Sequence, residues 1–521
     1  MIWHIFKKDA RLLWWLAAGV AGLRLAEVAV VRTVGLFPSS RQITNLINSL
    51  AAAVLLGTVF AICAVVHQDA IPGVRQDWLV RPIRRRDLLL SKLIFIVLLI
   101  EVPIFLADSL QGLAAGFPIG ASLTAAASRS MFLLFLVDIP LLAFASVTRN
   151  LLEAITGGVL LFLLFAVFME SFSGDPARRF QPTFGTGAEW ITACVLVLTM
   201  CIAAMVLLRL QFFRRRTVLA RYLVGAFAIC TLFSTFLPWQ PAFAIQKSLS
   251  PAPGSAAAIG LSFQPELGRI RRDPSFPTLV GNEMWAFVYL PMRISGLPDN
   301  SGVQSDKVRI RLLESSGAIS TLPSFSLTGL QLGVRRRQGS NADQDGYLTV
   351  PIPTDLYTRV KDRPVRMEID YSLTFFKLAS SHVLSAVNAN ERISGVGWCA
   401  TRINPSETSV QLSCEQAGRG PDCMTLALEH TPTGQKNPER FGCDADYAPF
   451  RDWQLMADGL ARFGGNLPFR DPNGLAKYPV NGSMLPQSRV DIQIYRAADH
   501  FTRTLSIGEI RLHDWEPAPA E

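Results

Sequence analysis

Long apolar runs fill the first 240 residues of the chain and restrict what this part can fold into. A transmembrane helix needs about 20 mostly apolar residues, and seven stretches meet this requirement. They are Leu12–Val34, Ile43–Val66, Leu88–Leu110, Ala125–Val147, Leu151–Met169, Trp190–Leu210 and Leu219–Leu237. We therefore expect residues 1–240 to form a polytopic α-helical membrane domain with about seven spans.

The first run allows a second interpretation, because Lys7, Lys8 and Arg11 precede it as in a cleaved signal peptide. The run continues past Arg24 to Val31, and six further candidate spans follow. A permanent first helix is the simpler interpretation.

The distribution of charge predicts an orientation. Residues 1–240 hold 21 Lys/Arg and 12 Asp/Glu, a net charge of +9, whereas residues 241–521 hold 29 of each. A nucleic-acid-binding protein would carry its basic patch on a polar domain, but here the excess lies in the apolar half. It occupies alternate loops, namely Lys7–Arg11, Arg75–Arg86, Arg149 and Arg214–Arg221. The positive-inside rule places these loops and the N-terminus in the cytoplasm of a multi-pass cell (inner) membrane, and seven crossings place the C-terminal half in the periplasm or outside the cell.

The composition changes after Pro238. Residues 241–280 are rich in proline and predict an extended connection. Beyond them, apolar and polar residues alternate, as in Val365–Leu373 and Val490–Ile494, which is typical of strands with one face in water. We expect residues 281–521 to form an all-β, sandwich-like extracytoplasmic domain of one or two modules.

Four cysteines fall within one region of this second half, residues 399–443. Cys399, Cys414, Cys423 and Cys443 are separated by 15, 9 and 20 residues and include no Cys-x-x-Cys pair. Such spacing does not suit common zinc sites. An even number of cysteines in a domain outside the cytoplasm predicts two disulfides, and three pairings are possible. No metal site is expected.

The loop between the second and third apolar runs, residues 67–92, carries the most distinctive motif of the chain. An amphipathic stretch around Asp77 and Trp78 ends at Pro82, because proline disfavours helix in the residue before it. One interpretation is an interfacial helix with an arginine anchor on anionic lipid head groups. The other is a docking element for a cytosolic protein. The motif is Asp77-Trp78-Leu79, Arg81-Pro82, Arg85, Leu88-Leu89 and Lys92.

This loop resembles the one after the second helix of ABC-2-type transporter permeases, the membrane subunits of ABC exporters. The N-terminal segment Ile2–Arg11 resembles the amphipathic segment that opens those permeases, so the resemblance covers residues 1–215 approximately. Two departures are visible. Gln68-Asp69 stands where the family often has a glutamate-rich start, and a seventh run and a large domain follow the usual six spans.

The resemblance implies a permease subunit powered by a separate cytosolic ABC ATPase that docks on loop 69–87. A second permease chain, identical or different, would complete the path. The docking residues would be Asp69, Asp77, Trp78, Arg81, Pro82 and Arg85. The sequence lacks the Gly-x-x-x-x-Gly-Lys-Ser/Thr phosphate loop, so we expect no enzyme activity and no cofactor in this chain, with ATP and Mg held by the partner ATPase.

Charged residues within the apolar runs are further candidates, since a charge in mid-membrane costs about 3 kcal/mol or more. Arg24 and Glu27 are three residues apart on one helix face and predict an intrahelical pair. Glu101 precedes Pro103 and Asp138 precedes Pro140. These two carboxyl groups are candidates for a translocation path, although Asp138 would equally suit a contact with a neighbouring helix.

In the permease hypothesis the extracytoplasmic domain contacts cargo or an envelope protein. The main alternative is a non-transporting receptor or scaffold, whose extracytoplasmic β domain binds a ligand or protein and whose helices only anchor it. A membrane-bound hydrolase is less consistent with the sequence. It contains neither a Gly-x-Ser-x-Gly elbow nor a His-Glu-x-x-His zinc helix.

Overall fold

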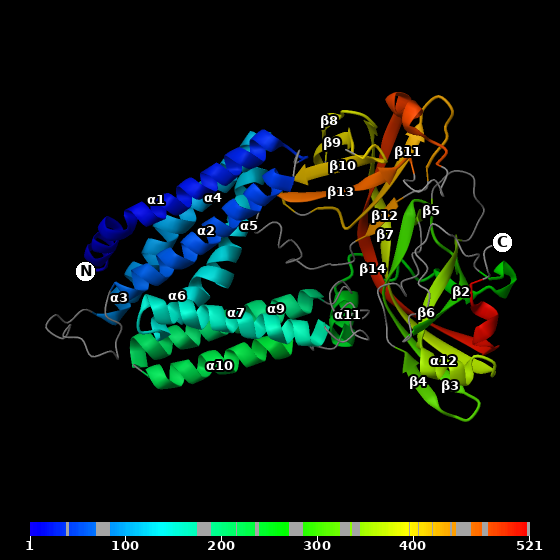
Figure 1. Cartoon of the computed structure of the whole chain (residues 1–521), viewed down its shortest axis with the longest axis horizontal. Helices are drawn as coiled ribbons and strands as arrows, with labels where there is room; N and C mark the ends of the chain where they lie inside the picture. The colour runs from blue at the N-terminus through cyan, green and yellow to red at the C-terminus, as the bar shows by residue number, and fades with distance from the viewer. Residues whose placement is uncertain are drawn as a thin grey trace.

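The structure is a computed structural model in which a helical bundle and a β-rich region follow one another along the longest axis (Figure 1). The β-rich region lies at one end of the bundle, and the N-terminus lies at the other (Figure 1). The residues described are 1–37, 41–68, 84–173, 189–214, 216–234, 239–269, 285–322, 334–335, 344–394, 396–404, 406–418, 420–437, 440–443, 460–470 and 478–517.

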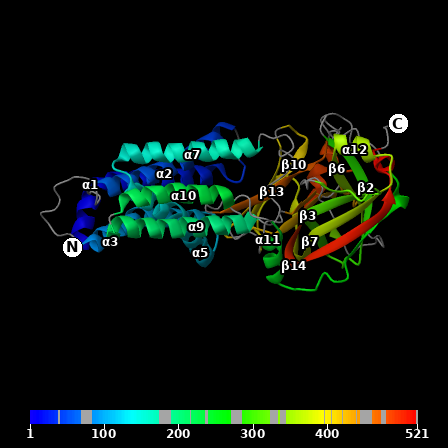
Figure 2. The same ribbon diagram turned by 90° about the horizontal axis from the view of Figure 1, so that it is seen from below.

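The helical bundle consists of α-helices, three of which continue into π-helical turns. Its elements are α1 (Ile2–Val34), α2 (Arg41–His67), α3 (Arg85–Phe95), η2 (Ile96–Glu101), α4 (Val102–Ala114), α5 (Ile119–Leu133), η3 (Leu134–Asp138), α6 (Ile139–Val147), α7 (Leu151–Ser173), α9 (Glu189–Leu208), η4 (Arg209–Arg214) and α10 (Thr217–Ser234). Figure 2 shows α7, α9 and α10 running alongside one another.

Five helical segments of the described chain are long and apolar enough to cross a membrane. They are Ile2–Val34, Gln42–His67, Arg85–Ala114, Ile119–Val147 and Cys194–Arg214. Within the described residues, α7 and α10 contribute the shorter apolar stretches Leu151–Leu161 and Thr217–Thr231. The structure therefore supports five of the seven predicted spans.

Two spans contain a π-helical turn that ends two residues before a proline. Pro103 and Pro140 stand at the second positions of α4 and α6, directly after the π-helical turns η2 and η3. Proline lacks an N–H and its ring clashes with the preceding turn of an α-helix. The wider turn absorbs this clash, because the Val102 and Ile139 N–H groups donate five residues back, to Val97 and Leu134. Both spans thus remain continuous helices with a π-bulge near the middle.

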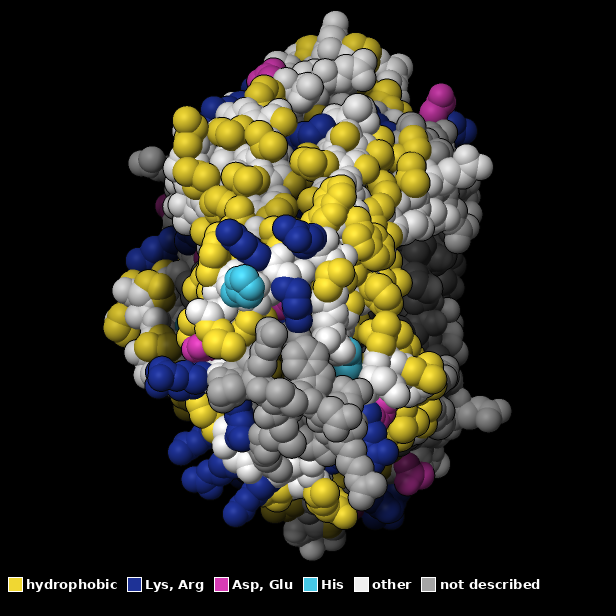
Figure 3. Space-filling view, turned by 90° about the vertical axis from the view of Figure 1, so that its left-hand side faces the viewer, with side chains coloured by type: hydrophobic (Ala, Val, Ile, Leu, Met, Phe, Trp, Pro, Cys, Tyr) yellow, Lys and Arg dark blue, Asp and Glu magenta, His cyan; other side chains and the backbone are white. Residues whose placement is uncertain are grey.

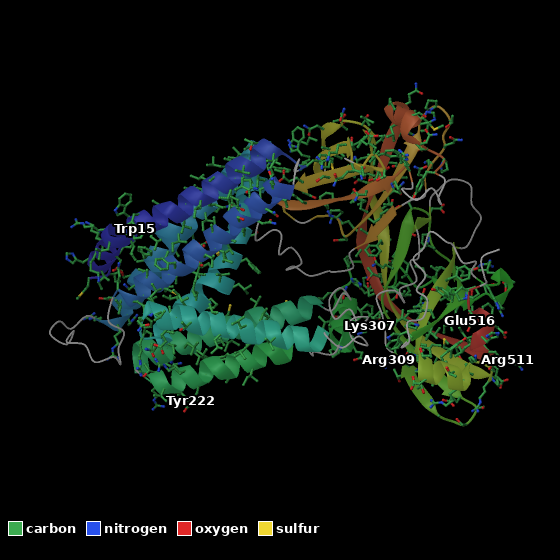
Figure 4. All side chains as sticks on the ribbon, in the orientation of Figure 1. Trp15, Tyr222, Lys307, Arg309, Arg511 and Glu516 are labelled. Carbon is green, nitrogen blue, oxygen red and sulfur yellow. A yellow bond between two sulfur atoms is a disulfide. The ribbon has the colours of Figure 1, made fainter. Side chains whose placement is uncertain are left out.

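Basic side chains gather at the end of the bundle farthest from the β-rich region. Figure 3 views this end and shows many Lys and Arg side chains and few acidic ones. Trp15 and Tyr222 project from the bundle near the same end (Figure 4) and are 58% and 75% exposed. Aromatic side chains of this kind mark the membrane–water boundary. We call this end the basic end.

The β-rich region, which we call the β domain, forms three antiparallel sheets within the described residues. A three-stranded sheet has the order β1 (Gly260–Phe263), β2 (Trp285–Ser295), β6 (Gln344–Pro353). A four-stranded sheet has the order β13 (Ala461–Pro468), β10 (Ser409–Gln416), β9 (Gly397–Ile403), β8 (Asn390–Ile393). The largest sheet has the order β12 (Arg440–Cys443), β11 (Cys423–His430), β14 (Ser488–Ile510), β7 (Val365–Ser385), β3 (Ser301–Glu314), β4 (Ile319–Leu322), with β5 (Val334–Arg335) on β3.

The long strands β7 and β14 run through two sandwich-like modules. The first half of β7 and the second half of β14 share a core with the three-stranded sheet, around Val288 and Ile369. The opposite halves share a core with the four-stranded sheet, around Leu412 and Ile492. The predicted alternation of apolar and polar residues therefore builds both modules. A short helix, α12 (Thr354–Val360), is the departure from the expected all-β composition.

The segment 241–280 was expected to be an extended connection, and its described part is more structured. It begins within helix α11 (Trp239–Ser248) and contains strand β1 and the short helix η5 (Pro265–Leu267). Ala256 and Ile259 are buried in the core of the first module. The prolines there form turns between these pieces, so residues up to 269 belong to the folded β domain.

Candidate functional site

A network of buried charges joins three helices near the middle of the bundle. Arg24 of α1 donates from Nε and Nη2 to Asp108 Oδ1 of α4 at 2.9 and 2.6 Å, and from Nη2 to Gln111 at 2.9 Å. Its Nη1 lies 2.7 Å from Glu27, the pairing expected from their spacing. Arg129 of α5 binds the other oxygen of Asp108. We call Arg24, Glu27, Asp108 and Arg129 the arginine–aspartate network.

The network lies about half-way along the apolar part of α1. At a rise of about 1.5 Å per residue, Arg24 lies about 14 Å along α1 from Trp15, and Val34 lies about 29 Å from Trp15. The hydrocarbon core of a bilayer is about 30 Å thick. Arg24, Glu27 and Asp108 each have a side chain no more than 2% exposed, so the two positive charges are balanced by two negative charges within the bundle.

The second buried group of the bundle is a pair of carboxyl groups on the two π-bulges. Glu101 is the last residue of η2 and Asp138 is the last residue of η3. The two turns pack against each other, the two carboxyl groups lie close enough to interact electrostatically, and they are 5% and 1% exposed. Both candidates for the translocation path therefore lie at one place, where the π-helical turns η2 and η3 pack against each other.

A buried ion pair ties the N-terminal segment to α3 at the basic end. Lys92 Nζ lies 2.7 Å from Asp9 Oδ2, and the side chains are 2% and 0% exposed. Lys8 Nζ lies 3.4 Å from the other oxygen of Asp9, and Arg85 donates to the Phe213 carbonyl at 3.3 Å. The predicted docking residues Asp69, Asp77, Trp78, Arg81 and Pro82 lie outside the described residues, and Arg85 begins α3.

The four-stranded sheet rests on the opposite end of the bundle, against the turns that follow α1 and α4. Arg32 of α1 lies 2.5 Å from Glu415 of β10, and Arg392 of β8 donates to the Gly116 carbonyl at 3.1 Å. Trp398 packs with Ala115 and Phe117 in a small apolar cluster. Gly116 has a φ of +77°, and a Cβ there would lie 3.0 Å from Trp398 Nε1, so glycine allows the close approach.

The cysteine region staples the two strands that make this contact. Cys399 and Cys414 form a disulfide and face each other across β9 and β10. Cys399 directly follows Trp398, and Cys414 directly precedes Glu415. These two interface residues face each other in the same ladder. Cys423 is also disulfide-bonded and lies opposite Cys443 in the ladder of β11 and β12. The bond between β9 and β10 therefore fixes the two strands that present Trp398 and Glu415 to the bundle.

A buried histidine links helix α11 to the largest sheet. His500 of β14 is 1% exposed and lies 2.8 Å from Thr374 Oγ1, which donates to Asp306 at 2.6 Å. Gln246 of α11 lies 3.3 Å from His500 Nδ1, and Phe243 packs edge-on against the ring. Burial lowers the pKa of His500 from 6.5 to about 4, against the attraction of the nearby carboxylates Asp499 and Asp422.

We expect the junction around His500 to lose stability in acid. Between pH 6.5 and about 4 the unfolded chain takes up a proton at His500 that the folded chain does not, so the free energy of unfolding falls as the pH falls. The loss amounts to about 1.6 kcal/mol from pH 6.5 to pH 5. It is measured from urea midpoints of the full chain in detergent at both pH values. His500→Gln should reduce this difference, and an unchanged difference would contradict the assignment.

Four of the charged residues that the structure joins had no buried partner assigned from the sequence. Asp108, Arg129 and Lys92 lie inside predicted apolar runs, and Asp9 precedes the first run. The sequence did indicate that such residues are paired, because a charged residue in an apolar run needs a partner. What the sequence lacked was the order in which the helices pack, which decides that Asp108 meets Arg24 rather than a residue on its own helix.

These features define a polytopic helical membrane protein with a β domain at one end of its bundle. No protein-family model matches the chain, and no curated protein matches it. Among the described residues, no group of three or more His, Cys, Asp or Glu side chains is placed to hold a metal ion.

Proposed function

We propose that the chain is the permease subunit of an ATP-driven exporter of the ABC-2 type. One observation carries the proposal: Lys92, the last residue of the loop motif, forms a buried ion pair with Asp9 of the N-terminal segment at the basic end. A cytosolic ATPase that docks on loop 69–87 would pull directly on α3 and, through this pair, on the N-terminal segment of α1.

In this proposal the basic end faces the cytoplasm and the β domain lies outside it. Arg84–Arg86, Arg149, Arg214 and Arg216 then follow the positive-inside rule. We infer that α7 and α10 also cross, because α10 packs along α9 and α7 runs in the same direction beside α10 (Figure 2). Five and seven are both odd numbers, so either count leaves the two ends of the chain on opposite sides.

ATP binding in two partner ATPases would move the loop ends of α2 and α3. Two permease chains would open a path beside α3–α4 and α5–α6, where Glu101 and Asp138 lie. The β domain would follow the movement through its contacts with the turns after α1 and α4. Its role is contact with cargo or an envelope partner, and the disulfide between β9 and β10 keeps that connection stiff.

The test is copurification of a tagged full chain with an ATPase that contains a phosphate loop, in a mild detergent. Replacing Asp77 and Trp78 together by alanine should weaken the complex about thirty-fold, since a buried tryptophan at an interface contributes about 2 kcal/mol or more. ATP hydrolysis in the remaining complex should fall in parallel. Arg86→Ala is the matched control, because a basic anchor supports topology rather than docking.

The receptor or scaffold function predicts a different outcome. A tagged chain that purifies without any ATPase, under conditions that preserve other membrane complexes, would contradict the permease. So would a complex that the Asp77 and Trp78 replacements leave as strong as the Arg86→Ala control.

A further inference from the structure

The two carboxyl groups on the π-bulges are built in the same way. Glu101 and Asp138 each end a π-helical turn, and each precedes a proline by two residues. The wider turns pack against each other, and this brings the two side chains together. π-Bulges within α-helices occur frequently at functional sites.

Other side chains do not satisfy these carboxyl groups. Within the part of the chain that the structure describes, no protein donor reaches any of the four oxygens of Glu101 and Asp138. Each carboxyl group lies close enough to the other to share a hydrogen bond when one of them carries a proton. A carboxylate buried without donors in an apolar bundle is strongly disfavoured, and two facing carboxylates are disfavoured further.

The neighbouring charges leave this pair without a counter-ion of its own. Arg129 of α5 is the cationic group whose charge acts on Glu101, and it is bound to Asp108, which also binds Arg24 of α1. On the remaining neighbour, α9, Cys201 donates to the Phe135 carbonyl of η3. The arginine–aspartate network is neutral by itself, so the carboxyl pair must be balanced by something that it binds.

We propose that Glu101 and Asp138 form an intramembrane proton-binding site in which the two carboxyl groups share one proton. A hydrogen bond between two carboxyl groups requires one O–H, whereas a metal ion would require several more oxygen ligands than this pair offers. Uptake takes one proton from water and forms one O–H bond, and release returns that proton to water. Separation of η2 from η3 would break the hydrogen bond, so proton occupancy follows the packing of the two interrupted helices.

Infrared spectroscopy of the full chain in lipid nanodiscs tests this inference without any ATPase, so it does not depend on the proposed transport function. At neutral pH we expect the C=O stretching band of a protonated carboxylic acid, shifted in deuterium oxide. The band should be lost in the double variant Glu101→Gln, Asp138→Asn. It should persist in Glu27→Gln, which removes a buried carboxylate that is ion-paired. A missing band in the wild-type chain, or a band that survives in the double variant, would overturn the proposal.

A second measurement covers the case in which the double variant fails to fold. A hydrophobic carbodiimide modifies protonated carboxyl groups, and mass spectrometry of the wild-type chain locates the adduct. We expect it on Glu101 or Asp138 and not on Asp108, which accepts bonds from two arginines. Equal labelling of Asp108 would contradict a proton shared by the π-bulge pair.

Discussion

Replacing Asp108 by alanine should destabilise the helical bundle by about 3–5 kcal/mol, the cost of leaving a buried charge without its partner. Asp108 accepts hydrogen bonds from Arg24 through one oxygen and from Arg129 through the other. Its removal leaves two buried guanidinium groups to share Glu27 and its neighbours. The measurement is the denaturation midpoint of the full chain as the fraction of SDS in mixed detergent micelles is raised.

A matched control separates this effect from the loss of any ion pair. Glu153 of α7 lies 3.0 Å from Arg221, but both side chains are about 40% exposed. Exposed pairs contribute less than about 1 kcal/mol, so Glu153→Ala should shift the midpoint little. Asp108→Asn, which keeps acceptor and size but not charge, should fall between the two. If Asp108→Ala is as mild as Glu153→Ala, the network does not hold the helices together.

The parts of the fold that repeat along the sequence were predictable from it. Apolar runs of about 20 residues identified the spans at Ile43–Val66 and Leu88–Leu110, and alternation identified β7 and β14. The lengths of the strands were less predictable than their positions. β7 and β14 continue for 21 and 23 residues through two modules, because a bulge in their ladder lets each strand turn its apolar face from one core to the other.

The contacts of the candidate site were much less predictable from the sequence than the helices and strands. Apart from Asp9, each buried charge of the bundle was visible in the sequence as an exception within an apolar run. Its partner was visible only where both residues stand on one helix, as with Arg24 and Glu27. Contacts such as Arg24 with Asp108 join positions 84 residues apart. Whether Asp138 meets Glu101 or a donor depends on how the π-bulges rotate the helices, which apolar periodicity does not specify.

Replacing Lys92 by methionine should free the N-terminal segment from α3. Methionine retains the apolar stem but removes the ammonium group from Asp9, whose side chain is fully buried. A buried carboxylate that loses its buried cation, and keeps only the partly exposed Lys8 ammonium at 3.4 Å, costs about 3 kcal/mol. Trypsin should therefore cut after Lys7, Lys8 or Arg11 roughly a hundredfold faster. Loss of an N-terminal tag from the full chain in detergent measures this rate.

Two variants decide whether the effect of Lys92→Met comes from the charge on Asp9. Lys8→Met removes a cation that is 41% exposed and 3.4 Å from Asp9, and it should alter proteolysis little beyond the loss of its own cleavage site. The double variant Asp9→Leu, Lys92→Met removes both buried charges and should restore resistance, because an apolar pair of similar volume replaces a buried ion pair without loss. Restoration would identify the pair as the joint through which force on α3 reaches α1. Persistent cleavage in the double variant would show that Lys92 acts there through packing alone.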